Sequence, residues 1–321
     1  MLALYCGDDR QVTLKELPSP EPGPGEVLIR VTLAGVCGTD LQILRGYHDF
    51  QGVMGHEFVG VVAGPPDSPW LGIRVVGEIN VNCGDCDLCR GGLPRHCRSR
   101  RVIGIKDRDG AFAPYLTLPE ANLHAVPPQV KDEAAVFIEP LAAALAVTAA
   151  VRLPIDSPLL VVGDGRLGLL ISWALALSAA EVHLVGHHAD HLALAEPYGV
   201  TTFLEKDLPA GDYVAVVEAS GAPQGLDLAL SRVRPRGTVI VKSTFAGRYP
   251  LDPAALVVPE VRLAGSRCGP FAPALRLLAQ ARIDPRPLIA KRFPLSQGLE
   301  ALAWAQRSGV LKVLLDCGEG S

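Results

Sequence analysis

Two short stretches near the N-terminus carry side chains that could bind a metal ion. Cys37 lies in Gly35-Val-Cys-Gly-Thr-Asp40, and His56 and Glu57 follow in Gly55-His-Glu57. A thiolate, an imidazole and a carboxylate are donors that zinc accepts, and three protein ligands leave a fourth position for water or substrate. Each residue alone is more commonly a buried, inert side chain. Together they predict a catalytic zinc site.

A second group of cysteines is more closely spaced. It consists of Cys83, Cys86, Cys89 and Cys97. Four thiolates at this spacing close a tetrahedron around one ion, so they predict a structural zinc. An iron–sulfur cluster and a disulfide are the alternatives; the long last gap and the missing proline after Cys97 disfavour the cluster. His96 is a less favoured substitute ligand. Three cysteines without a partner at metal spacing are interpreted as small buried residues: Cys6, Cys268 and Cys317.

A glycine-rich turn in the middle of the chain predicts a dinucleotide site. The apolar run Pro158-Leu-Leu-Val-Val162 is typical of a strand, and Gly163-Asp-Gly165-Arg166-Leu167-Gly168 leads from it into an apolar helix. In that context the glycines permit a tight turn and a close approach to pyrophosphate, whose charge the helix N-terminus favours. Further strand-like and helix-like runs alternate up to residue 264, which predicts six strands in a doubly wound parallel sheet.

The end of the second strand of this sheet bears on the choice between NAD and NADP. NAD-preferring enzymes place an acidic residue there, whereas this chain has Gly186, followed by His187 and His188. Without a carboxylate a 2'-phosphate is not repelled, and both imidazoles could donate to it, so NADP is favoured over NAD. We therefore expect Gly186→Asp to shift preference toward NAD. Asp190 could still serve the ribose, and with His191 the histidines could begin a solvated helix or form a metal site.

The remaining elements must position these groups. Short strand-like runs, interrupted by glycine and proline, predict an irregular β-barrel in the first third of the chain. The run from Glu26 to Ala34 reads as a buried strand that delivers the chain to Cys37. After residue 282 the pattern changes, with an amphipathic helix expected over Gln297 to Ser308 and a strand over Leu311 to Asp316.

Composition limits the class of protein. The 321 residues include 49% hydrophobic and 20% charged residues, enough for two domains with large cores. A net charge of -4 provides no basic face for nucleic acid. No apolar run is long enough to span a membrane, and no export signal is visible, so we expect a cytoplasmic protein that binds neither nucleic acid nor membrane. Eight cysteines in such a compartment indicate metal binding more than disulfides.

With these motifs and Ile138-Glu139-Pro140-Leu141, the chain resembles the zinc-dependent medium-chain dehydrogenases of the alcohol dehydrogenase superfamily, and most closely the sorbitol, threonine and glucose dehydrogenases. The resemblance implies an α/β protein with a GroES-like irregular β-barrel catalytic domain, residues 1–143 with 283–321, and a Rossmann domain, residues 144–282. It also implies that Cys37 and His56 bind the catalytic zinc, that Glu57 is a ligand, and that Glu139 binds directly or through water.

Two neighbouring residues have expected roles in proton handling. Asp40 is placed to accept the free ring N–H of His56, which would fix the tautomer of that ligand. The resemblance gives Thr39 the role of hydrogen-bonding the substrate oxygen and passing its proton onward. Thr39 and Asp40 could equally close a turn and cap a helix over Leu41 to Arg45. Many relatives have a histidine where this chain has Gln42, which cannot titrate.

The expected activity is the reversible oxidation of a primary or secondary alcohol, with polyols and sugars as one candidate class, by hydride transfer to NADP or NAD. One alternative is an NADPH-dependent reductase of activated double bonds, although such enzymes generally lack both zinc motifs. Another is a non-catalytic sensor that binds NAD(P)H. The resemblance also implies a homodimer, formed through the nucleotide domains, or a homotetramer.

Overall fold

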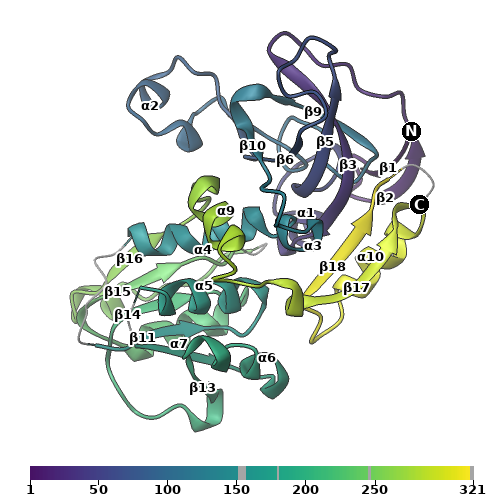
Figure 1. The fold of residues 1–321 in the computed structure, drawn as a ribbon. Coiled ribbons are helices and arrows are strands. Elements are labelled where there is room, and N and C mark those ends of the chain that lie inside the picture. Colours follow the sequence, from purple (N-terminus) through teal and green to yellow (C-terminus); the bar gives the residue numbers. More distant parts are fainter. Residues whose placement is uncertain (151–156, 179–180, 245–246, 319–321) are drawn as a thin grey trace. The chain divides into compact units, whose positions relative to one another are not determined.

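The computed structural model describes residues 1–150, 157–178, 181–244 and 247–318 of an α/β protein. The chain separates into two compact units. The first combines Met1–Glu139 with Phe271–Ser321, and the second is Pro140–Pro270 (Figure 1). Within the described ranges, no helix is long and apolar enough to cross a membrane.

The first unit is built on a mixed seven-stranded sheet, in which β9 joins the path at β3. Its strands are β10 (Leu123–Ala125), β6 (Arg74–Gly77), β5 (Glu57–Gly64), β3 (Glu26–Val36), β18 (Lys312–Asp316), β17 (Ile289–Pro294) and β9 (Tyr115–Pro119). Smaller sheets are formed by β2 (Val12–Glu16), β1 (Leu2–Cys6) and β4 (Gly52–Val53), and by β7 (Asn80–Val81) and β8 (Arg101–Val102). Strand β3 runs two residues beyond the expected Ala34 because Val36 pairs with Val313 of β18.

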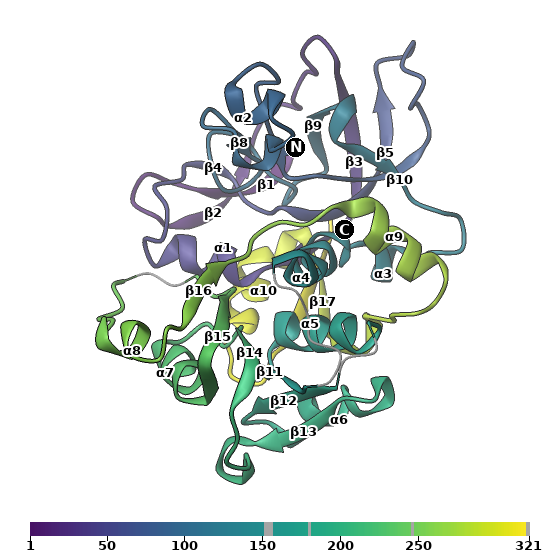
Figure 2. The same cartoon turned by 90° about the vertical axis from the view of Figure 1, so that its left-hand side faces the viewer.

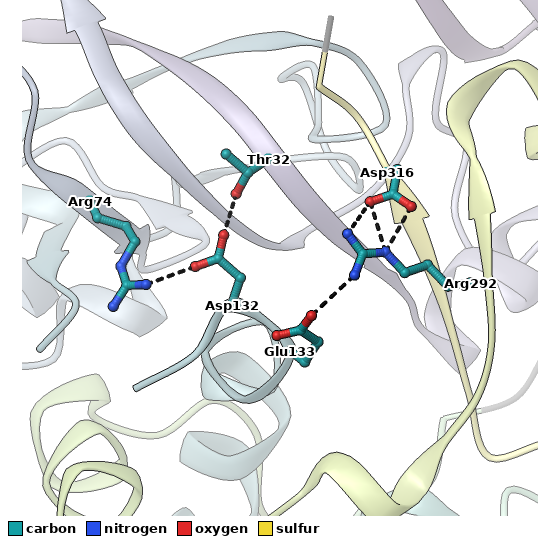
Figure 3. A network of polar contacts seen from close by, with 6 residues as sticks. All are labelled: Thr32, Arg74, Asp132, Glu133, Arg292 and Asp316. Carbon is teal, nitrogen blue, oxygen red and sulfur yellow. Dashed lines mark hydrogen bonds and ion pairs between the residues drawn. The ribbon is translucent and has the colours of Figure 1, made fainter. Parts of the chain in front are cut away.

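Short helices complete the first unit: α1 (Gly38–Leu44), α2 (Asp87–Arg90), α3 (Asp132–Ala135), α9 (Phe271–Ala279) and α10 (Gly298–Ala305). Helix α1 begins three residues before the expected Leu41, because the Asp40 carboxylate accepts the backbone N–H of Cys37 and caps the first turn. Polar contacts of α3 with β3, β6 and β17 are shown in Figure 3. They tie the returning C-terminal segment to the N-terminal strands.

The second unit contains the six-stranded parallel sheet that the sequence predicts. Its order is β13 (Thr201–Leu204), β12 (Val182–Gly186), β11 (Leu159–Val162), β14 (Tyr213–Glu218), β15 (Val233–Val241) and β16 (Arg262–Gly265), side by side in Figure 2. In chain order this is 3-2-1-4-5-6, the arrangement of dinucleotide-binding folds. The accompanying helices are α5 (Arg166–Ala176), α6 (Ala189–Ala193), α7 (Pro223–Arg232) and α8 (Ala254–Val257), and α4 (Ile138–Ala150) crosses the boundary between the units.

The central strand β11 is apolar and buried at all four residues, because both faces of the sheet are covered there. Leu160, Val162, Val185, Val216 and Val239 pack in one core cluster. Of the three cysteines outside the metal-spaced motifs, Cys6 and Cys317 are buried as expected, but Cys268 is only half-buried because it lies in the loop between β16 and α9.

Candidate functional site

Strand register brings three distant parts of the chain to one end of the mixed sheet. Gly35 of β3 pairs with Glu57, the first residue of β5. Val36 of β3 pairs with Val313 of β18. Cys37 follows β3 directly, so it lies beside the start of β5 and the start of β18.

The three metal-ligand candidates from the first motifs lie together. Ligand atoms of Cys37, His56 and Glu57 all lie within 4.8 Å of one another, and His56 and Glu57 are buried. Among the described residues, Glu57 Oε1 has no hydrogen-bond partner. A buried acceptor without a partner is costly, so it indicates that a donor or cation belongs there. Sulfur, ring nitrogen and carboxylate oxygen form a donor set that fits zinc.

Asp40 contacts both Cys37 and His56. Its Oδ2 accepts the Cys37 backbone N–H at 2.7 Å, and its Oδ1 lies 3.2 Å from His56 Nδ1 without hydrogen-bond alignment. Burial lowers the pKa of His56, but Asp40 and Cys37 outweigh burial and hold the pKa well above its ordinary value. With Nδ1 directed at Asp40, the other ring nitrogen is the one left to bind a metal. Asp40 therefore caps α1 and orients His56.

The Thr39 hydroxyl lies next to this group. Its Oγ1 is 3.7 Å from Cys37 Sγ. Gly55, which precedes His56, has a φ of +94°, and a Cβ there would lie 2.3 Å from the Phe112 ring. Glycine is therefore required for the backbone to enter the site in this conformation.

Lys312 is a site residue that the sequence reading missed. Its ammonium group forms an ion pair with Glu57 Oε2, donates to the Val36 carbonyl at 3.2 Å and lies 5.4 Å from the centroid of the Phe137 ring. Both charged side chains have 0% exposure, so each depends on the other for compensation. Only Oε1 of Glu57 is left to approach a metal. The sequence feature that could have identified Lys312 is a single lysine next to the apolar run of β18.

Glu139 stays a prediction as a fourth ligand. It is half-buried in the first turn of α4 and is not part of the 4.8 Å group.

The four close-spaced cysteines form a second metal-ligand group. Cys83 Sγ lies 3.4 Å from Cys97 Sγ, and Cys86 Sγ lies 3.5 Å from Cys89 Sγ and 3.9 Å from Cys97 Sγ. Zinc–sulfur bonds in a tetrahedron separate the sulfurs by about 3.8 Å. All four cysteines are free, which excludes the disulfide alternative in this structure. His96 is outside the group. The backbone N–H of Cys89 lowers the pKa of Cys86, whereas hydrogen bonding with Asp85 raises the pKa of Cys83.

The glycine turn has the strand–turn–helix context that the sequence predicts. Gly163 follows β11 with a φ of +111°, and Gly165 caps α5, whose first residues are Arg166 and Leu167. A Cβ on Gly168 would lie 1.8 Å from the Gly163 carbonyl oxygen. The glycines therefore allow the close packing of turn and helix that pyrophosphate binding needs.

Asp164, in the middle of this turn, lies where the sequence suggested that a carboxylate was missing. Its Oδ2 accepts the backbone N–H groups of His187 at 2.9 Å and of His188 at 2.6 Å. A Cβ on Gly186 would lie 2.3 Å from both Cβ and Cγ of Asp164. A side chain at position 186 would therefore overlap Asp164, so the expected effect of Gly186→Asp on cofactor preference stays a prediction that must also account for displacement of Asp164.

The histidines near Asp164 have carboxylate neighbours. His188 Nδ1 lies 3.1 Å from Asp164 Oδ2, and His187 Nε2 lies 3.2 Å from Glu205 Oε2. Asp164, His188 and His191 form a third group with ligand atoms within 4.8 Å of one another. The sequence analysis considered a metal site at these histidines but did not include Asp164 as a possible ligand.

Comparison with known proteins adds a family context. Residues 23–128 match the alcohol dehydrogenase GroES-like domain. L-Threonine 3-dehydrogenase of Streptomyces avermitilis is 31% identical over 331 residues, which cover 94% of this chain and 95% of the relative. Among solved structures, the short chain alcohol dehydrogenase RspB of Escherichia coli CFT073 in complex with NADH has a TM-score of 0.89 and 27% identity, and covers 98% of this chain and 99% of its own. A protein of Sinorhizobium meliloti 1021 described as a zinc-binding dehydrogenase, bound to NADP, has a TM-score of 0.88 and 27% identity, with 98% of both chains covered.

Proposed function

Because this chain belongs to the zinc-dependent medium-chain dehydrogenases, in their sorbitol and threonine dehydrogenase-like branch, we propose that Cys37 and His56 hold the catalytic zinc at which it oxidises an alcohol. The protein is an NAD(P)-linked oxidoreductase of the alcohol dehydrogenase type. The observation that carries the zinc assignment is the meeting of Cys37, His56 and Glu57, with the buried Glu57 Oε1 lacking a partner among the described residues.

Alcohol oxidation removes a hydride from the carbinol carbon and a proton from the hydroxyl group. When bound, zinc would supply Lewis acidity at the substrate oxygen, and the nicotinamide would supply the hydride acceptor. The side chains of this protein transfer the proton. Thr39 Oγ1, beside Cys37, would accept the hydroxyl proton as it gives its own proton to a solvent water, while Asp40 holds the His56 ring in position.

Lys312 determines which oxygen of Glu57 is available as a ligand. Lys312 retains Oε2, so Oε1 is the Glu57 oxygen that would be available to a bound zinc, and Glu139 would contribute directly or through water. The four clustered cysteines hold a second, structural zinc. Residues 1–143 with 283–321 serve as the catalytic domain and 144–282 as the nucleotide-binding domain. Polyols and sugars are the candidate substrate class, and the assembly is a homodimer or homotetramer.

The assignment is tested with Cys37→Ser. We expect the zinc content of the variant to fall by one ion per chain and alcohol oxidation to be lost, because the soft thiolate ligand is gone. Binding of NADH and NADPH, followed by fluorescence, should be retained. Cys268→Ser, which alters a cysteine outside all three metal-ligand groups, is the matched control and should keep both zinc and activity. Near-full alcohol oxidation by Cys37→Ser would contradict the proposal.

A further inference from the structure

We propose that Asp164, within the glycine turn, is the residue that makes this enzyme prefer NAD to NADP, by accepting hydrogen bonds from the hydroxyl groups of the adenosine ribose. The inference deepens the proposed function and rests on it only in taking the cofactor to be a nicotinamide dinucleotide. It replaces the NADP preference that the sequence suggested, which depended on the absence of a carboxylate at this place.

The carboxylate is fixed in position by its surroundings. Its Oδ2 receives two backbone N–H groups, at 2.9 Å from His187 and 2.6 Å from His188, and lies 3.1 Å from His188 Nδ1. Within the described part of the chain, all hydrogen bonds to Asp164 end at Oδ2, so Oδ1 keeps its capacity to accept from a ligand. An acceptor held by backbone donors is pre-organised, and binding then costs little ordering.

In this chain the acidic residue is Asp164 in the glycine turn, and the end of the second strand carries Gly186 instead of an acid. In dinucleotide-binding folds the ribose-binding acid is normally attached to the end of the second strand, here Gly186 at the end of β12. In this chain a Cβ on Gly186 would lie 2.5 Å from Asp164 Oδ2, so the two positions cannot both carry a side chain. The carboxylate therefore occupies the region that a residue 186 acid would fill, but it is delivered from the glycine turn.

The nearby histidines do not favour a 2'-phosphate in this arrangement. The two imidazoles that could donate to it instead face carboxylates, His188 that of Asp164 and His187 that of Glu205 at 3.2 Å. A dianionic phosphate on the ribose would meet these negative charges at short range, where repulsion is strong. Rejection of NADP by an unfavourable charge contact is a common means of specificity.

A cation held by Asp164, His188 and His191 is the competing interpretation, since their ligand atoms lie within 4.8 Å of one another. The hydrogen bonds argue against it. The two backbone N–H groups that converge on Asp164 Oδ2 present positive dipole ends to this place, which suit an anionic acceptor and oppose a cation. The ribose interpretation uses the oxygen that these donors leave available.

The test measures the dissociation constants of NADH and NADPH by fluorescence, without turnover, for the full-length enzyme and three single variants. Wild type should bind NADH more tightly than NADPH by about tenfold or more, because of the charge contact. Asp164→Asn keeps an oxygen for the backbone N–H groups and removes the charge, so the preference should fall by about tenfold. Asp164→Ala should lower it as well, and Gly186→Asp alone should weaken both cofactors through steric overlap with Asp164.

A double variant provides the decisive comparison. In Asp164→Ala/Gly186→Asp the turn no longer fills the space, and the acid returns to the end of β12, so the NAD preference should recover relative to Asp164→Ala. Thermal unfolding of each variant separates loss of fold from loss of selectivity. A wild type that prefers NADPH, or an Asp164→Asn variant with an unchanged ratio, overturns the assignment of Asp164. Failure to bind either cofactor overturns the proposed function itself, so the two failures are distinguishable.

Discussion

Lys312 is a charged side chain with no exposed surface, and its buried partner Glu57 belongs to the candidate zinc site. Removing one member of a buried ion pair leaves the other charge uncompensated. We expect Lys312→Met to lower the free energy of unfolding by about 3 kcal/mol or more. Urea denaturation of the zinc-loaded enzyme measures this loss.

The control for Lys312 is the double variant Lys312→Met/Glu57→Gln. It removes both charges, so its loss of stability should be clearly smaller than the sum of the two single losses. Additive losses would show that the two groups do not stabilise each other in the folded protein.

At this scale, residue types in short motifs could be predicted, but partners set by strand register could not. Cys37, His56 and Asp40 lie within a few residues of each other or in motifs with known ligand chemistry, and the structure places them together. Lys312 reaches Glu57 only because β18 returns to pair with β3. Asp164 was visible in the glycine turn, but its contact with the end of β12 depends on the parallel pairing of β11 and β12.

Helix α3 links strands of the first unit through two adjacent acidic residues (Figure 3). Asp132 accepts the Thr32 hydroxyl at 2.9 Å and the Arg74 guanidinium at 3.0 Å, and its side chain is 30% exposed. Asp132→Ala leaves Arg74 without this partner, so we expect a loss of about 1–2 kcal/mol in the free energy of unfolding. Chemical denaturation followed by circular dichroism measures it.

The neighbouring Glu133 is a matched control for Asp132. It contacts Arg292 at 3.1 Å, but Arg292 also bonds Asp316, and the Glu133 side chain is 38% exposed. Glu133→Ala should therefore cost less than about 0.5 kcal/mol. If both variants lost the same free energy of unfolding, the contacts of Asp132 would stabilise the protein no more than the contact of the more exposed Glu133.

The cysteine lobe has almost no apolar core of its own. In the segment from Cys83 to Cys97, only Cys97 is buried, and the segment carrying α2 projects from the rest of its unit (Figure 1). Without burial, a bound metal must supply most of its order. We expect Cys86→Ser to lose the structural ion and to make the bonds after Arg90 and Arg95 readily cleaved by trypsin, while NADH binding is unchanged. Unaltered protease resistance after metal loss would refute the structural role.

Element types were predictable where burial leaves a clear pattern. The inner strand β11 is a continuous buried apolar run, and β14 is apolar up to its last residue, Glu218, so the sequence identifies both. Strand β15 begins at Val233, five residues before the expected Thr238, because its first half carries exposed arginines that give no strand pattern. Helix boundaries were less predictable: α10 ends at Ala305, three residues before the expected Ser308, in a sequence that does not itself mark the end of the helix.

At the scale of the whole molecule, β16 forms one edge of the parallel sheet. Among the described residues, β16 pairs with β15 alone, and apolar side chains are exposed on it and just before it: Leu263 at 38%, Val257 at 73% and Val258 at 81%. Open edges with exposed apolar residues are normally covered, in many proteins by a second copy of the chain. This region is therefore where we expect subunits of the proposed homodimer to meet.

Charged substitutions at this edge test the assembly. Val258→Glu and Leu263→Glu should each shift the enzyme toward monomer at micromolar concentration, because an interface must then bury an unpaired carboxylate. Sedimentation equilibrium gives the dissociation constant directly. Leu299→Glu, at a residue 44% exposed on α10, introduces the same charge outside the parallel sheet and should leave the assembly unchanged. An edge variant that retains the wild-type mass would place the subunit contact elsewhere.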